Sequence, residues 1–314
     1  MSTCTSPCIH TTRKLHAPPY ATVKYAPATL AILLLIFCRT SVAAEDQSRH
    51  CADADPESPV NSQTLAVATL NISHGRNTAM NQMFVSTKRT YENLDRIAAF
   101  LDEIDVDIVA LQEADAESKW SGKFDHVRYL VDNTEFNCSI HGRHARSWLY
   151  AYGTALLAKN GLAESKSMEF EPTPPTTTKG FVQAKFDWSV NGETTPVTVV
   201  SVHLDFSSKK VRDAQINEMI TVLSKLDSDL IIMGDLNSEW FDERPHVRYL
   251  AKGLGLEAYN PDGPGLGTFK SQDGKRLDWI LISSRLEFVE YKVLPDVVAD
   301  HLAVYAEIQY RGNE

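Results

Sequence analysis

The chain has 314 residues, of which 43% are hydrophobic, and a formal net charge of −10. This length suits one large domain or two ordinary ones with an ample core. An acidic surface does not attract polyanions, which weighs against a non-specific nucleic-acid binder, although one local basic cleft would be enough to override it.

Residues 1–44 differ from the rest in charge, with four basic side chains and no acidic ones. A short apolar run, Leu30–Cys38, is followed by small residues as far as Ala44. This pattern predicts a secretory signal peptide cleaved near Ala44, and hence export to a periplasm or out of the cell. An uncleaved segment would instead anchor the protein to a membrane. Without these residues the chain keeps 27 basic and 41 acidic side chains, a formal charge of −14.

Residues 45–63 are polar, include Pro56 and Pro59, and are expected to form a flexible lead-in. The exported chain would keep only Cys51 and Cys138. Export permits one disulfide between them, but both could equally be free thiols. No Cys/His cluster has the spacing of a zinc site.

The first predicted unit is a strand, a helix and a second strand. Leu65–Leu70 is an apolar strand, Arg89–Ile104 has one apolar face of helical period, and Asp107–Leu111 is the next strand. If the two strands are parallel, Asn71 and Glu113 meet at one edge of the sheet. Amide and carboxylate oxygens suit Mg²⁺ or Ca²⁺.

The rest of the chain reads mainly as strands with two helices. A hairpin is expected around Asn191-Gly192, and residues 120–148 give no clear pattern. We predict an α/β fold of two packed, mostly antiparallel sheets flanked by helices, as one domain over residues 64–310. The expected elements are strands over 152–158, 180–186, 195–203, 231–235, 276–282 and 302–308, and helices over 211–226 and 245–252.

The stretch Ile231–Asn237 is a buried strand that ends in polar residues. Asp235 and Asn237 alternate with Leu236, so on an extended chain they point to the same side. Taken alone, an Asx-type turn that caps the strand is the commoner explanation. Other apolar strands, however, end in similarly placed polar side chains.

Eight polar residues beside apolar strand sequence form the candidate site. Each would cost free energy there unless it were paired. The chain has no Gly-x-Ser-x-Gly elbow for a serine hydrolase and no phosphate-cradling glycine loop. What remains fits metal-assisted hydrolysis, with oxygen ligands, a carboxylate to align water, and imidazoles near a phosphate. The residues are Asn71, Glu113, His203, Asp235, Asn237, Asp278, Asp300 and His301.

The order of these motifs over residues 64–309 resembles the endonuclease/exonuclease/phosphatase superfamily, whose fold is a four-layer α/β sandwich. The resemblance implies that Asn71 and Glu113 hold Mg²⁺, or Mn²⁺ or Ca²⁺ in its place, with Asp300 supporting the metal. It implies that Asp235 orients or deprotonates water and that Asn237 holds the phosphate. His203 and His301 would stabilise the developing charge or the leaving oxygen, with Asp278 orienting His301.

The expected function is that of an exported, Mg²⁺-dependent phosphodiesterase acting on a phospholipid head group or a small phosphodiester. Lys179-Gly180 resembles a dipeptide of sphingomyelinase-like members, although a surface lysine is the commoner case. A secreted nuclease of the same fold is one alternative, and a non-catalytic binding module is another, against which the full motif set argues. No obligate protein partner is evident, and a monomer is expected.

Overall fold

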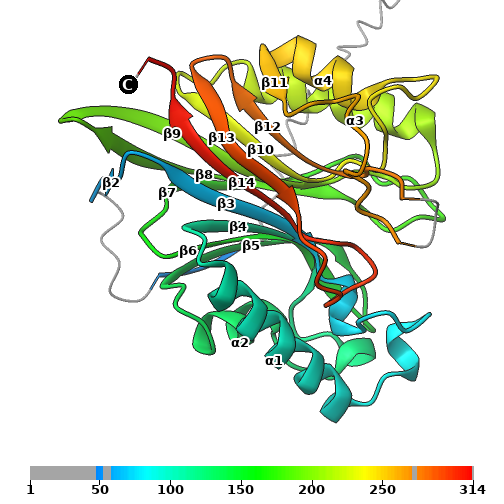
Figure 1. The fold of residues 1–314 in the computed structure, drawn as a ribbon. Coiled ribbons are helices and arrows are strands. Elements are labelled where there is room, and N and C mark those ends of the chain that lie inside the picture. The colour runs from blue at the N-terminus through cyan, green and yellow to red at the C-terminus, as the bar shows by residue number, and fades with distance from the viewer. Residues whose placement is uncertain (1–46, 52–57, 271–273, 313–314) are drawn as a thin grey trace, which may run out of the picture. The chain divides into compact units, whose positions relative to one another are not determined.

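The structure is a computed structural model, and it describes residues 47–51, 58–270 and 274–312. Chain contacts separate residues 1–42 from residues 43–314, and the first unit lies outside the described residues. The predicted signal peptide therefore also lies outside them. All that follows concerns the second unit (Figure 1).

The first sheet has seven strands and contains the predicted strand–helix–strand unit. Its two strands run parallel, with Asn71 opposite Gln112, so Asn71 and Glu113 end at the same edge, as predicted. The last described strand is next to the edge of this sheet, between β13 (Leu286–Val293) and the first long strand. In spatial order the strands are β1 (Gln47–Cys51), β5 (Cys138–Arg146), β6 (Ala151–Ala158), β4 (Ile108–Asp115), β3 (Leu65–Asn71), β14 (Val304–Tyr310) and β13 (Leu286–Val293).

The second sheet also has seven strands. The predicted hairpin is present, with Asn191 and Gly192 both at positive φ in its turn. The last strand of the hairpin pairs in parallel with the next one along the chain, which places His203 opposite Asp235. The spatial order is β11 (Leu256–Ala258), β12 (Asp278–Ser283), β10 (Asp229–Asp235), β9 (Glu193–His203), β8 (Gly180–Val190) and β2 (Val60–Asn61), with β7 (Ala163–Glu169) also paired to β8.

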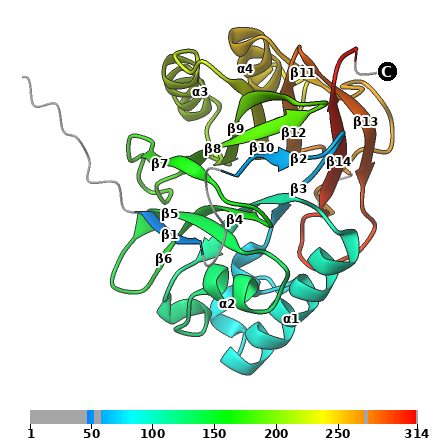
Figure 2. The ribbon, with the colours of Figure 1, turned by 90° about the vertical axis from the view of Figure 1, so that its left-hand side faces the viewer.

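The two sheets pack face to face with helices on both outer faces (Figure 2). One apolar core lies between the sheets. A second joins the first sheet to α1 (Thr87–Ile104) and α2 (His126–Asp132), and a third joins the other sheet to α3 (Lys209–Leu223) and α4 (His246–Leu254). The predicted four-layer sandwich is confirmed, and both sheets are mixed rather than purely antiparallel.

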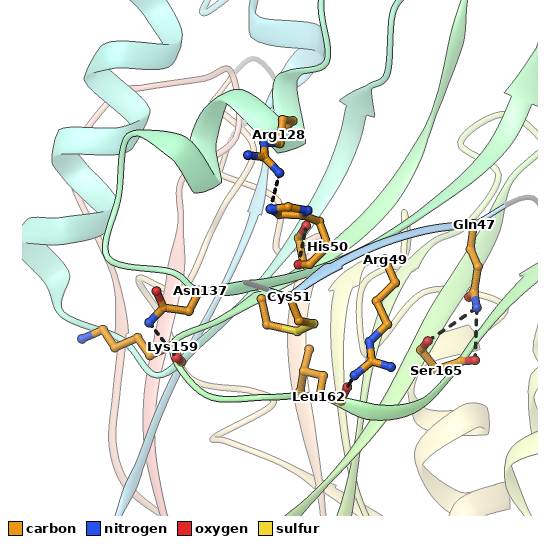
Figure 3. The surroundings of a disulfide bond; sticks show 11 residues. Gln47, Arg49, His50, Cys51, Arg128, Asn137, Lys159, Leu162 and Ser165 are labelled. Carbon is orange, nitrogen blue, oxygen red and sulfur yellow. Dashed lines mark hydrogen bonds between the residues drawn. A yellow bond between two sulfur atoms is a disulfide. The ribbon is translucent and has the colours of Figure 1, made fainter. Parts of the chain in front are cut away.

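The expectation of a flexible lead-in over residues 45–63 needs correction, because two short strands lie within it. β1 adds to the edge of the first sheet, and β2 pairs with β8. Cys51 is directly opposite Cys138, and the two form a disulfide (Figure 3). Arg49 and Gln47 also donate hydrogen bonds to the carbonyl oxygens of Leu162 and Ser165 (Figure 3). Polar composition hid these strands because an edge strand is largely solvated.

Four further strands, β5, β7, β11 and β13, were not predicted, and neither was α2. The described residues also include three short 3₁₀ helices, η1 (Ser73–Gly75), η2 (Gln82–Phe84) and η3 (Lys119–Ser121). All three lie in loops that leave the first sheet at the edge where Asn71 and Glu113 end. Within the described ranges, no helix has the length and apolar character needed to cross a membrane.

Candidate active site

A polar cavity of about 440 Å³ lies where the ends of the two sheets meet. It is lined by side chains from both sheets, which are far apart along the chain. Of the eight predicted residues, seven line the cavity: Asn71, Glu113, His203, Asp235, Asn237, Asp300 and His301. Asp278 is fully buried directly behind them.

Asp235 is the buried carboxylate at the centre of the site. Its Oδ1 accepts a hydrogen bond from the backbone N–H of Asn237 at 2.9 Å, which forms an Asx-type turn. Asp235 therefore both caps the strand and lies at the cavity. Its Oδ2 accepts one from Asn71 Nδ2 at 3.2 Å. Burial, reinforced by the negative charge of Asp278, raises the pKa of Asp235 to about 7. A carboxylate with this pKa can accept a proton near neutral pH.

Gly234 allows the strand to carry Asp235 into this position. Its φ is +149°, and a Cβ placed there would lie 2.0 Å from the carbonyl oxygen of Val202 on the neighbouring strand β9. The absence of a side chain therefore permits β10 and β9 to approach closely just before both strands reach the cavity.

His301 and Asp278 form the hydrogen-bonded pair that the sequence predicted. His301 Nδ1 lies 2.7 Å from Asp278 Oδ2, which also accepts the hydroxyl of Thr268 at 2.6 Å. Burial would lower the pKa of His301, but the charges of Asp278 and Asp235 outweigh it and raise that pKa to about 10. The imidazole is therefore a cation at neutral pH, with its Nε2 3.8 Å from Asp235 Oδ2.

His203 faces the same carboxylate but has the opposite charge behaviour. Its Nε2 is 3.6 Å from Asp235 Oδ2. Burial and the neighbouring Lys179 lower the pKa of His203 well below its ordinary value, so it is neutral. Lys179 is itself only 6% exposed, with Nζ 3.3 Å from His203 Nδ1. The expectation of a surface lysine was wrong, because the strand that follows starts at Gly180, directly opposite His203.

Glu113 reaches the cavity through an irregularity of β4. Its φ is +50°, and the register of β4 against β6 shifts between Leu111 and Ala114. Such a bulge re-aims a side chain that would otherwise follow the strict alternation of the strand. Positive φ at a residue other than glycine costs free energy, which the packed surroundings must offset.

A second buried ion pair, which the sequence analysis missed, supports Glu113 from behind. His74 lies between Asp115 at 2.8 Å and Glu113 at 3.3 Å. Trp120 Nε1 donates to the other oxygen of Asp115 at 2.8 Å. Burial would lower the pKa of His74, but the two carboxylates outweigh it and raise it. The polar run after Asn71 was the available signal, and only the fold shows that it turns back onto β4.

The oxygen donors along one wall fit a hard divalent cation. Asn71 and Glu113 lie on adjacent parallel strands and line the same cavity, and Asn71 Oδ1 accepts a hydrogen bond from the backbone N–H of Ser73 at 3.0 Å. Asp300 stands beside them, where it accepts from the hydroxyl of Ser73 and pairs with Arg76 at 2.7 Å. Neutral amide and charged carboxylate oxygens are the ligands that Mg²⁺ prefers.

A second group of ligating atoms lies deeper in the site. Asp235, Asp278 and His301 have potential ligand atoms within 4.8 Å of one another. His301 Nδ1 and Asp278 Oδ2, 2.7 Å apart, form a strong hydrogen bond, which leaves His301 Nε2 as the imidazole nitrogen that could face a cation. The structure therefore offers two groups of potential ligand atoms, and the wall with Asn71 and Glu113 is the one made of oxygen ligands alone.

The sequence profile of the endonuclease/exonuclease/phosphatase family matches residues 68–301. The chain belongs to this family. The match begins within β3 and ends at His301, so it spans every residue of the candidate site. The chain is thus an enzyme of the endonuclease/exonuclease/phosphatase family, whose members generally depend on a divalent metal.

Solved structures of the family share the fold at low identity. A family protein from Leptotrichia buccalis is 17% identical with a TM-score of 0.62, over 78% of this chain and 100% of that one. The human Nocturnin catalytic domain with bound sulfate is 16% identical with a TM-score of 0.59, over 85% and 99%. A Bacteroides thetaiotaomicron mannosyl-6-phosphatase is 16% identical with a TM-score of 0.59, over 78% and 100%. No curated protein matches the sequence.

Proposed function

We propose that the protein is an exported, Mg²⁺-dependent hydrolase of phosphoesters, acting on a phosphodiester such as a phospholipid head group. The observation that carries this proposal is the convergence on Asp235 Oδ2. Asn71 Nδ2, His203 Nε2 and His301 Nε2 approach this single oxygen at 3.2, 3.6 and 3.8 Å. A proton acceptor, a neutral imidazole and a cationic imidazole thus face one small volume.

Each of these groups has a distinct part in the proposed reaction. Asp235 orients a water and takes its proton as the water oxygen forms a bond to phosphorus. His301, which holds a proton at neutral pH, stabilises the negative charge on the phosphoryl oxygens and gives that proton to the departing oxygen as its bond to phosphorus breaks. His203 donates a hydrogen bond without adding charge, and the amide of Asn237 holds a phosphoryl oxygen.

Asn71 and Glu113, with Asp300 beside them, would hold the Mg²⁺. When bound, the cation would neutralise charge on the phosphoryl oxygens. Arg76, Lys209, Arg212 and Lys275 also line the cavity, and cations of this kind suit an anionic ester. The disulfide between Cys51 and Cys138 supports the proposed export, because such bonds persist in oxidising compartments.

A substrate screen tests the proposal. The purified protein would be assayed with Mg²⁺ and with a chelator against bis-p-nitrophenyl phosphate, sphingomyelin, lysophospholipids, RNA and plasmid DNA. We expect Mg²⁺-dependent hydrolysis of a lipid or small diester, and loss of that activity in Asp235→Asn. Plasmid nicking at low salt, with no hydrolysis of the other compounds, would instead establish the nuclease. If none of these esters were hydrolysed, the non-catalytic binding module would be the remaining explanation.

A further inference from the structure

Four large apolar side chains project from the loops beside the cavity. Met80 is 99% exposed, Met83 59%, Phe84 88% and Trp148 79%. The first three lie on or next to η2, which is held by its cap, since Asn81 Oδ1 accepts from the backbone of Met83 at 2.8 Å. The loop is therefore an ordered projection whose apolar side chains point into solvent, and we call these four residues the apolar rim.

The two loops that carry the apolar rim are linked through η3. η2 lies near η3, and η3 contacts the loop between β5 and β6. Lys119 makes that second contact: its backbone N–H donates to the carbonyl of Leu149 at 2.9 Å, and its Nζ lies 5.4 Å from the ring of Trp148. A lysine thus lies beside the Trp148 part of the apolar rim.

The charge of these loops is opposite to that of the chain as a whole. Residues 76–91 contain Arg76, Lys88 and Arg89 and no acidic residue, and residues 119–124 contain Lys119 and Lys123 and no acidic residue. Glu92, which pairs with Lys88 and Arg89, is the first acid beyond the longer loop, while Glu117 and Asp125 flank the shorter one. A local excess of cations around apolar side chains complements an anionic lipid surface.

The same loops are tied directly to the candidate site. Arg76, the first residue of the longer loop, and Ser73 just before it both bond Asp300. The shorter loop contains Trp120, whose indole N–H holds Asp115 and thereby the His74 and Glu113 pair. Both loops are therefore joined by short contacts to residues of the candidate site.

We propose that the apolar rim docks the protein on an anionic lipid surface, with Met80, Phe84 and Trp148 entering the head-group region and Lys119 and Lys123 facing lipid phosphates. Separate protruding side chains can enter a soft surface without a matching pocket, and Trp favours the membrane–water interface. Docking of this kind would bring the cavity to the membrane. The inference goes beyond the proposed reaction, since docking requires neither hydrolysis nor a lipid substrate.

Co-sedimentation with vesicles tests the docking. The full chain would be mixed, in chelator, with vesicles of phosphatidylcholine alone or with added phosphatidylglycerol. The triple variant Met80→Ser, Phe84→Ser, Trp148→Ser should need about tenfold or more lipid for half-binding. The double variant Lys119→Gln, Lys123→Gln should lose the preference for phosphatidylglycerol. All variants keep residues 1–44, so any binding by that segment is common to them.

A control removes exposed apolar side chains elsewhere on the protein. Tyr249→Ser with Val289→Ser changes residues that are 55% and 51% exposed on α4 and β13, and vesicle binding should not change. Thermal unfolding checks that each variant is folded. Wild-type-like binding by the triple variant, equal loss in the control, or no vesicle binding by the wild type would each overturn the proposal. Failure of the proposed hydrolysis would appear only in the ester assays.

Discussion

Asp235 is a buried carboxylate whose surroundings fix its position and shift its pKa. It is almost fully buried, yet both of its oxygens are positioned by hydrogen bonds, from Asn237 and Asn71. Its pKa of about 7 means that it exchanges protons near neutral pH. The carboxylate of Glu113 differs, because it is partly accessible to solvent, with 20% of the side chain exposed. These environments support the proposed division of roles, in which Asp235 transfers a proton and Glu113 binds the metal.

Replacing Asp235 with Asn should therefore abolish proton transfer while keeping the size of the side chain. We expect kcat to fall by about 10²–10⁴-fold, with little change in KM, because the residue acts mainly in the transition state. Steady-state kinetics on a soluble diester would measure both values. The exposed acid Asp187 supplies the control, and Asp187→Asn should behave as the wild type.

Glu113→Gln should respond to metal where Asp235→Asn does not. Loss of a charged oxygen ligand weakens Mg²⁺ binding, so part of the activity should return as the Mg²⁺ concentration is raised. Titration of Mg²⁺ against both variants separates the roles. Should Mg²⁺ rescue Asp235→Asn and leave Glu113→Gln inactive, the assignment of the two carboxylates would be reversed.

The pair formed by His301 and Asp278 predicts a pH-dependent stability. The folded pKa of His301 is about 10, above its ordinary 6.5, so the stability it contributes is complete below pH 6.5 and is lost as the pH rises toward 10. Asp278→Asn removes most of this contribution. In chelator, the difference in unfolding free energy between wild type and variant should be largest below pH 6.5 and should shrink by pH 10. A difference that stays constant over this range would refute the assigned charge.

At the scale of elements, the site depends on how closely β9 and β10 approach. Gly234→Ala would place a Cβ 2.0 Å from the Val202 carbonyl and force the strands apart just before Asp235. We expect a loss of about 1–3 kcal/mol in unfolding free energy, together with reduced activity. Gly192→Ala is the control, because its φ is also positive but nothing lies within 4 Å of the added Cβ. Equal effects at the two positions would exclude a steric role.

The sequence predicted the elements whose burial leaves a clear pattern. β3, β4, β9, β10 and β12 are buried on both faces and read as apolar runs, and their polar ends marked the site. β7 and β13 alternate irregularly because one face is solvated, and β5 carries the buried His141 and His144, so none of them was recognised. Apolar periodicity reports burial, and it reports a strand only indirectly.

The part of the site that could not be predicted depends on contacts between distant segments. No local pattern shows that β4 bulges at Glu113, because the cause is pairing with β6 some forty residues later. His74 and Lys179 are likewise placed by strands that meet only in the folded chain. The order of the motifs in the sequence identified the polar residues at the strand ends. The three-dimensional structure was needed to show which of these residues lie close enough to share a proton.

At the scale of the whole molecule, the disulfide joins β1 to β5 at the end of the first sheet that lies far from the cavity. Cys138 lies opposite Ala158, whereas the cavity lies beyond the other end of β6, near Tyr152. Replacing both cysteines with Ser should therefore lower the unfolding free energy by about 2–5 kcal/mol, since the bond joins residues 87 positions apart, and leave kcat/KM unchanged. Denaturant unfolding and assays of the same samples would measure this. An unaltered unfolding midpoint would contradict the expected stabilisation.

The place of the last strand has a consequence for the timing of biosynthesis. β14 follows every other strand of the first sheet in the sequence, yet it fills the position between β3 and β13, and Asp300 and His301 shortly precede it. A nascent chain that still lacks residues 300–310 has a gap in its first sheet and no His301 to face Asp235. The candidate site therefore cannot be complete until β14 has been synthesised and has left the ribosome.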